Sequence, residues 1–190
     1  MTNKSNYLGS IKKQFAYYKH LGEKTIEQLD DEHLFWLPNS DSNSIAIIVN
    51  HLCGNMKSRW TDFLISDGGK EWRQRDREFE DVIKTRTELE EHWTSGWNCV
   101  IKAIKVLRED DLNTTIHIRN QGHTVVEAIN RQLAHYAYHV GQIVLIGKML
   151  KGADWISLSI PKGKSEAYNL EKFAKAKRRE HFTDEFLEEK

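Results

Sequence analysis

Apolar side chains recur at intervals of three and four residues along four long stretches of the chain. The stretches cover residues 5–29, 44–64, 81–108 and 125–151. This spacing places the apolar positions on one face of an α-helix and the polar positions on the opposite face. The pattern therefore predicts four long amphipathic helices. Turn-forming residues separate them, for example the run Ser66-Asp67-Gly68-Gly69.

The segments outside these stretches have different patterns. Residues 70–80 are polar apart from Trp72 and Phe79, which predicts a long loop of the kind that often carries function. Residues 113–124 alternate β-branched and polar side chains around Asn120-Gln121-Gly122, which predicts a short hairpin. We therefore expect an all-α fold. Residues 1–152 form a four-helix bundle with a short β-like excursion before the fourth helix, and residues 153–190 form an extended tail with a short exposed helix.

Composition narrows the class of protein. The chain has 190 residues, and its 28 basic residues balance 28 acidic ones. A formal net charge of zero argues against a general nucleic-acid binder, which needs a basic excess or a basic face. No apolar run is long enough to span a membrane, and the N-terminus has no signal-peptide pattern. With two cysteines 46 positions apart, Cys53 and Cys99, we expect a cytoplasmic protein with reduced thiols.

Histidine carries the main chemical signal. His135 and His139 are four residues apart on the fourth predicted helix, so their side chains share a face and could bind one ion. His51 lies beside the apolar stripe of the second helix and can face this pair. Three neutral imidazoles would leave coordination positions open, as in catalytic metal sites. The alternative is that these histidines are packed core residues. The other six are interpreted as surface or structural residues: His20, His33, His92, His117, His123 and His181.

Several polar side chains near these histidines are candidates for the pocket around a metal ion. Asn55 lies one turn beyond the histidine of the second helix, and Arg59 lies two turns beyond it. Arg59 could bind a substrate carboxylate, although an ion pair with Asp62 or with a loop acid is at least as plausible. On the fourth helix, Arg131 faces the same way as the histidine pair, or is simply solvated. Tyr138 is a further candidate for packing or for the pocket rim.

The polar loop holds three arginines within residues 72–77, but acidic residues at positions 71, 76, 78 and 80 offset them. We interpret the loop as salt-bridged, or as a dimer contact, in preference to an anion site. Gly163-Lys164-Ser165 is not a phosphate loop, because position 158 is leucine where the first glycine is required. Cys53 lies two residues from His51 and so about 200° around the helix, pointing away from any ion.

Two segments resemble the DinB-like (DinB/YfiT) superfamily. They are residues 47–64, IIVNHLCGNMKSRWTDFL, and residues 132–143, QLAHYAYHVGQI. The tail at residues 157–165, SLSIPKGKS, is similar to that of an uncharacterised branch, and the resemblance spans about residues 5–170. It implies an up-down-down-up four-helix bundle that binds nickel or zinc through three histidines, which match His51, His135 and His139. It also implies homodimers, and in some members a low-molecular-weight thiol cosubstrate used by S-transferases or isomerases. Other members resemble hydrolases.

The expected function is therefore a divalent-metal-dependent enzyme that acts on small molecules. A thiol-dependent S-transferase is the first interpretation and a hydrolase is the close variant. An open divalent site lowers the pKa of bound water and can deprotonate a coordinated thiol. The rival hypothesis is a non-catalytic metal-binding or interaction bundle. A site open to a ligand-sized pocket favours the enzyme, and a site closed by side chains or by the tail favours the rival.

Overall fold

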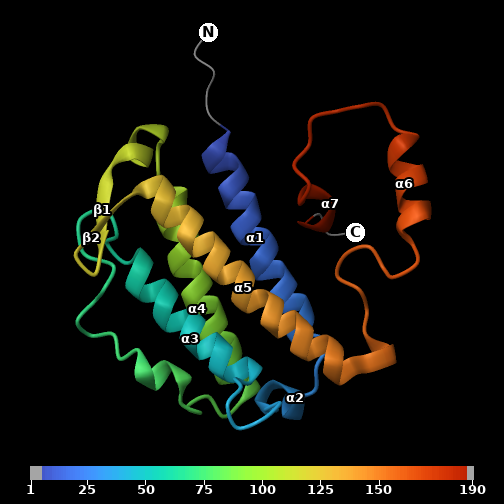
Figure 1. Ribbon diagram of the computed structural model, residues 1–190, viewed down its shortest axis with the longest axis horizontal. Coiled ribbons are helices and arrows are strands. Elements are labelled where there is room, and N and C mark those ends of the chain that lie inside the picture. Colours follow the sequence, from blue (N-terminus) through green and yellow to red (C-terminus); the bar gives the residue numbers. More distant parts are fainter. Residues whose placement is uncertain (1–5, 188–190) are drawn as a thin grey trace.

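The computed structural model describes residues 6–187 and is mostly helical. Its long helices form a bundle, as the apolar spacing predicts (Figure 1). They are α1 (Tyr7–Ile26), α3 (Ile45–Trp60), α4 (Arg86–Lys105) and α5 (Val125–Lys151). The predicted start of the first helix at Ser5 lies outside the described residues.

The bundle is closed by contacts of α3 with α4, α1 with α5, α1 with α4, and α3 with α5. In Figure 1, α1 and α5 run in one direction, and α3 and α4 run in the opposite direction. The connection over residues 61–85 makes this possible, because it carries the chain back along the bundle before α4 begins. The helices therefore follow the up-down-down-up order.

Aromatic side chains fill the centre of the bundle. The rings of Phe15, Trp97 and Tyr136 are fully or almost fully buried and contact one another at centroid distances of 5.7–6.4 Å. The Trp60 indole N–H donates to the Tyr136 hydroxyl (2.9 Å), which donates to the Asn55 side-chain oxygen (3.2 Å). This chain of hydrogen bonds ties Asn55, a candidate pocket residue, to the core between α3 and α5.

Several predicted boundaries are wrong by a few residues. Helix α3 ends at Trp60 and not near residue 64, since the backbone turns at Asp62, which has a φ of 50°. Helix α4 begins at Arg86 and not at residue 81, because Thr85 and Glu88 form a capping box there. The apolar pattern predicts no helix or strand for residues 31–35, which follow the first predicted helix. In the structure they form the short helix α2 (Asp31–Phe35).

The predicted hairpin is present as β1 (Thr115–Ile118) and β2 (Gln121–Thr124), an antiparallel pair. Its turn is Arg119-Asn120 and not the expected Asn-Gln-Gly, because Ile118 pairs directly with Gln121. Both turn residues have positive φ, 56° and 60°. The Asp67 carboxylate accepts their two backbone N–H groups at 2.7 Å, which stabilises this conformation without glycine.

Beyond α5 the chain forms α6 (Ser165–Phe173) and α7 (Asp184–Leu187), so it holds more helix than the predicted tail. Helix α7 packs on α1 (Figure 1). Lys13 forms an ion pair with Asp184 (2.6 Å), and His181 hydrogen-bonds to Ser10 (2.9 Å). The proposed boundary between residues 152 and 153 remains a prediction.

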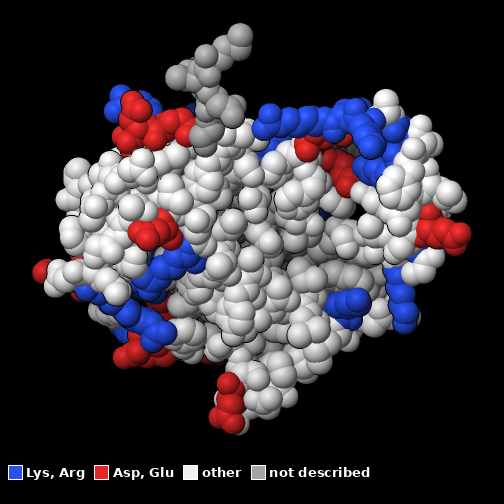
Figure 2. Space-filling view, turned by 45° about the horizontal axis from the view of Figure 1, so that its top comes forward, with Lys and Arg blue, Asp and Glu red and all other residues white. Residues whose placement is uncertain are grey.

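Charge is distributed without a dominant sign on the face shown in Figure 2. Basic side chains lie next to acidic ones at the left, where the hairpin lies in Figure 1, and over the C-terminal segment at the upper right. Within residues 6–187, none of the helices combines the length and apolar character needed to cross a bilayer.

Candidate metal centre

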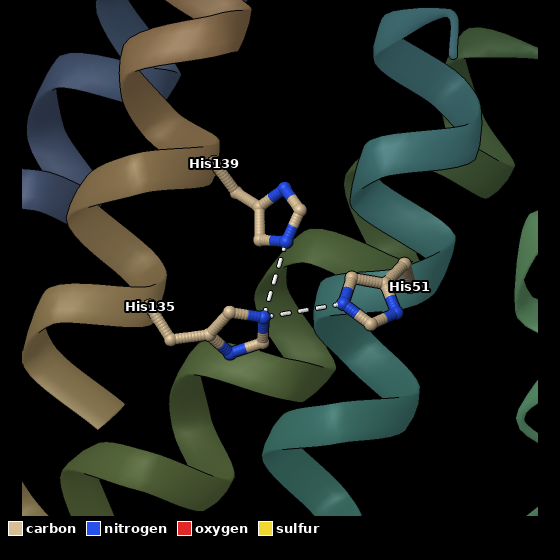
Figure 3. A group of neighbouring side chains, drawn as sticks. All are labelled: His51, His135 and His139. Atoms are coloured by element: carbon tan, nitrogen blue, oxygen red, sulfur yellow. Dashed lines mark hydrogen bonds between the residues drawn. The ribbon is translucent and has the colours of Figure 1, made fainter. Parts of the chain in front are cut away.

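Three imidazoles from two helices meet between α3 and α5 (Figure 3). The Nε2 atom of His135 lies 3.3 Å from Nε2 of His51 and 3.1 Å from Nε2 of His139. The potential ligand atoms of the three side chains all lie within 4.8 Å of one another. His51 and His139 are buried and His135 is half-buried. The pair on α5 and the single histidine on α3 therefore converge as the sequence predicts.

The His51 ring is oriented by a carboxylate from the connection between α3 and α4. Its Nδ1 donates to Oε2 of Glu78 at 2.9 Å, since an ionised carboxylate can only accept. Arg73 donates to the same carboxylate from its Nε (2.6 Å) and Nη2 (2.8 Å). The Phe79 ring stacks on the imidazole at 4.6 Å. With Nδ1 engaged by Glu78, the His51 ring directs its Nε2 toward the other two histidines.

His139 is oriented in the same way from its own helix. Its Nδ1 lies 2.8 Å from Oε1 of Gln142, one turn further along α5, and donates to that oxygen. Its Nε2 lone pair therefore also faces the cluster. The Nε2 atom of His135 carries at most one proton, so it can donate a hydrogen bond to only one of the two neighbouring Nε2 atoms. One divalent cation shared by the three lone pairs would satisfy all of them, so the residues present fit a divalent metal ion.

The environment keeps the histidine pair on α5 neutral. Burial, together with the neighbouring His139 and His51, lowers the pKa of His135 to about 3. Burial likewise lowers the pKa of His139. For Glu78, burial acts to raise the pKa, but the hydrogen bonds from Arg73 and His51 outweigh it and the net pKa is lowered. At neutral pH His135 and His139 are therefore unprotonated ligands and the supporting carboxylate is charged.

Local packing explains how Glu78 reaches α3. The residues Asp76–Phe79 form a short 3₁₀ helix against α3. The Asn50 side-chain amide donates to the Glu78 backbone oxygen at 3.0 Å. A Cβ at Gly54 would overlap the Glu78 carboxylate, so only glycine lets the loop approach this closely. The sequence does not reveal this partner of His51, because it depends on how a long loop folds back.

The histidine cluster opens into a pocket of about 490 Å³. All four candidate pocket residues, Asn55, Arg59, Arg131 and Tyr138, line it. Within the part of the chain that the structure describes, the lining also contains basic residues of the connection and of the hairpin turn, and it contains no aspartate or glutamate. The lining residues are Asn43, His51, Asn55, Arg59, Arg73, Arg75, Phe79, Arg119, Arg131, Gln132, His135, Tyr138, His139 and Gln142.

The candidate pocket residues differ in their environments. Tyr138 is 63% exposed and lies at the rim, and Arg131 contacts His123 (3.3 Å). Arg59 is buried and donates to the Gly68 backbone oxygen, so the alternative of an ion pair with Asp62 or a loop acid is wrong for the described residues.

Cys53 is buried and does not line the pocket, in line with its predicted direction away from the ion. Burial raises the pKa of its thiol. The lining residues that the sequence did not single out as pocket residues come mainly from the 61–85 connection and the hairpin turn. For the residues of the connection, the length of the polar loop and its cluster of arginines were the signals in the sequence.

Comparison with known proteins identifies a family without an assigned activity. A family model described as "Protein of unknown function (DUF1572)" matches residues 2–164, which include the bundle and all three clustered histidines. No curated protein matches the chain.

Proposed function

The chain belongs to the DUF1572 family, whose function is unknown, and we propose from its site that it is a divalent-metal-dependent enzyme acting on small molecules. The observation that carries the proposal is the convergence of three imidazole Nε2 atoms at the wall of an open pocket. His51, His135 and His139 would hold the ion. When bound, a nickel or zinc ion supplies Lewis acidity and lowers the pKa of a coordinated water or thiol.

The openness of the site supports an enzyme over a non-catalytic bundle. The pocket beside the histidines has the volume of a small-molecule site. The C-terminal segment does not cover it, because α7 packs on α1 and not between α3 and α5 (Figure 1). The resemblance of residues 47–64 and 132–143 to DinB-like proteins supports the same reading, and with it a homodimer in the cytoplasm.

Among metal-dependent reactions, we favour transfer to a low-molecular-weight thiol over hydrolysis. A metal-assisted hydrolase commonly uses a carboxylate beside the metal as general base for water. Here Glu78 is already engaged by Arg73 and His51, so it is not free for that role. A thiol bound to a metal ion loses its proton without a separate base. The chain would then contribute binding and orientation: Asn55, held by Tyr136, and the arginines of the lining would position the second substrate.

The test is an activity screen of the nickel- and zinc-loaded protein. One arm offers a small thiol with a chromogenic aryl halide, and the other offers a chromogenic ester alone. We expect thiol conjugation by the loaded protein and its loss in His139→Ala. His92→Ala, which changes a half-buried histidine on α4 outside the cluster, should behave as the wild type. Ester hydrolysis alone would support the hydrolase. Equal rates in the wild type and in His139→Ala would contradict the proposal.

A further inference from the structure

Five arginine side chains gather around the same pocket from separate parts of the chain. Arg59 comes from α3, Arg73 and Arg75 from the connection before α4, Arg119 from the hairpin turn and Arg131 from α5. Among residues 6–187, the lining contains no acidic residue. A chain with zero net charge therefore concentrates positive charge at one cavity.

Most of this charge is not neutralised by the protein. Arg73 pairs with Glu78, and outside the pocket Arg77 pairs with Glu80, as the salt-bridge interpretation of the loop predicts. Arg59, Arg75, Arg119 and Arg131 have no carboxylate within 4.0 Å among residues 6–187. Arg75 instead lies over the Phe79 ring, 5.4 Å from its centroid. Within residues 6–187 the salt-bridge interpretation of the loop therefore does not hold for Arg75.

Burying the Arg59 guanidinium without an anionic partner costs free energy. Its side chain is only 7% exposed, and its Nε has no hydrogen-bond partner. Its guanidinium donates to a backbone oxygen, Gly68 O, and is not ion-paired. Burial, together with the charges of Arg73, Arg119 and Arg131, lowers the pKa of Arg59 to about 10. A buried cation without an anion is unfavourable, so a ligand that supplies negative charge would be bound strongly.

We propose that this pocket binds a small organic molecule that carries at least two negative charges, on two carboxylates or on a phosphate. Guanidinium groups bind both kinds of group through paired N–H donors. Arginines on several sides of a cavity of about 490 Å³ can hold two such groups at once. The ligand's remaining part would face the histidine cluster. This inference adds a substrate class to the proposed function. Only the statement that the ligand's remaining part faces the histidine cluster rests on the metal site.

The test is calorimetric binding to the full-length protein, both metal-free and nickel-loaded. The probes are succinate, its singly charged monoamide, and glycerol 3-phosphate. We expect succinate or glycerol 3-phosphate to bind at least about tenfold more tightly than the monoamide, and binding to weaken as salt is added. Equal affinity for succinate, glycerol 3-phosphate and the monoamide would overturn the proposal. A preference between succinate and glycerol 3-phosphate would identify the anionic group.

Substitutions locate the binding site. Arg75→Gln and Arg131→Gln, which change exposed side chains, should each weaken binding of the preferred dianion by about tenfold. The matched control is Arg77→Gln, an exposed arginine of the same loop that does not line the pocket, and it should bind as the wild type does. If Arg77→Gln weakens binding as much as Arg75→Gln, the basic side chains of the loop attract the dianion without specificity, and the pocket is not the binding site.

The two proposals can fail separately. Metal content is measured on the same samples and in His135→Ala, whose arginines are unchanged. Dianion binding without bound metal would retain this inference and contradict the metal-dependent function. Bound metal without dianion binding would retain the function and overturn this inference.

Discussion

The Glu78 carboxylate fixes the positions of two side chains at the site, the His51 imidazole and the Arg73 guanidinium. Its two oxygens contact His51 on one side and the Arg73 guanidinium on the other, and all three side chains are more than nine-tenths buried. The three histidines could be predicted from spacing because two share a helix face. Glu78 could not, since it is 27 residues from His51 and reaches it only through tertiary folding.

We predict that Glu78→Gln weakens metal binding by about 10–100-fold, as is typical for a partner that orients a ligating histidine. The amide keeps the side-chain size but removes the charge that fixes the His51 tautomer and neutralises Arg73. Affinity is measured by competition with a chromophoric chelator. Glu80→Gln, an exposed neighbour, is the control, and an equal loss in both variants would show that the effect is not specific.

A second residue-scale prediction concerns Asp67, which accepts the N–H groups of Asn120, Gly69 and Arg119. These hydrogen bonds, with that of Asn120 the strongest influence, lower the pKa of Asp67. The ionised carboxylate therefore stabilises the fold above its unfolded pKa of about 4, and this stability is lost as the pH falls through the lower folded value.

We expect Asp67→Asn to lower the free energy of unfolding by about 1–3 kcal/mol at neutral pH, since hydrogen bonds to a charged group are lost. The difference from the wild type should shrink under acid conditions below the folded pKa. Urea unfolding at both pH values measures it, with Asp110→Asn at an exposed site as the control. A difference that grows in acid would contradict this role.

At the scale of elements, each long helix could be predicted, but the rotation of α5 only approximately. Its apolar pattern predicts a core stripe through Ile129, Leu133, Tyr136 or Ala137, Val140 and Val144. The structure buries Ile129, Tyr136 and Val140, but it also buries Gln132 and leaves Leu133 and Val144 only partly buried. Tyr136 is a large ring that completes the aromatic centre, so packing there outweighs the burial of a leucine. This rotation also brings His139 into the buried face.

Two helical glycines provide a matched test of how closely the helices pack. A Cβ at Gly96 on α4 would lie 3.0 Å from the Met56 sulfur and 3.1 Å from the Cys53 backbone on α3. A Cβ at Gly141 on α5 would meet nothing within 4 Å. Gly96→Ala should destabilise by about 1–3 kcal/mol through overpacking. Gly141→Ala should stabilise by about 0.5–1 kcal/mol, because alanine favours the helix. Urea unfolding distinguishes them, and stabilisation by both would refute the close approach.

At the scale of the whole molecule, the C-terminal segment and the candidate metal centre are separate. His181 hydrogen-bonds to Ser10 on α1 and to Thr183 (2.8 Å), which is fully buried. The Phe182 ring packs against Tyr17, also on α1. The sequence predicts an exposed tail here, because most of its side chains are charged, and the few residues that anchor it have no periodic pattern.

We predict that His181→Ala loosens the segment around α7 without affecting the metal centre. Proteolytic cleavage within residues 174–187 should become faster, since the hydrogen bonds to Ser10 and Thr183 are lost. Metal content should stay at the wild-type value. His33→Ala, on the short helix α2, is the control for loss of a surface histidine. Loss of metal in His181→Ala would mean that the tail supports the site.

Metal analysis measures whether the three histidines hold one divalent ion, as we propose. Protein purified without a histidine tag is analysed by mass spectrometry beside His135→Ala, before and after reconstitution with nickel and zinc. We expect about one ion per wild-type chain and its loss in the variant, because only two imidazoles remain there. The absence of metal from both proteins after reconstitution would contradict the metal site and identify the histidines as packing residues.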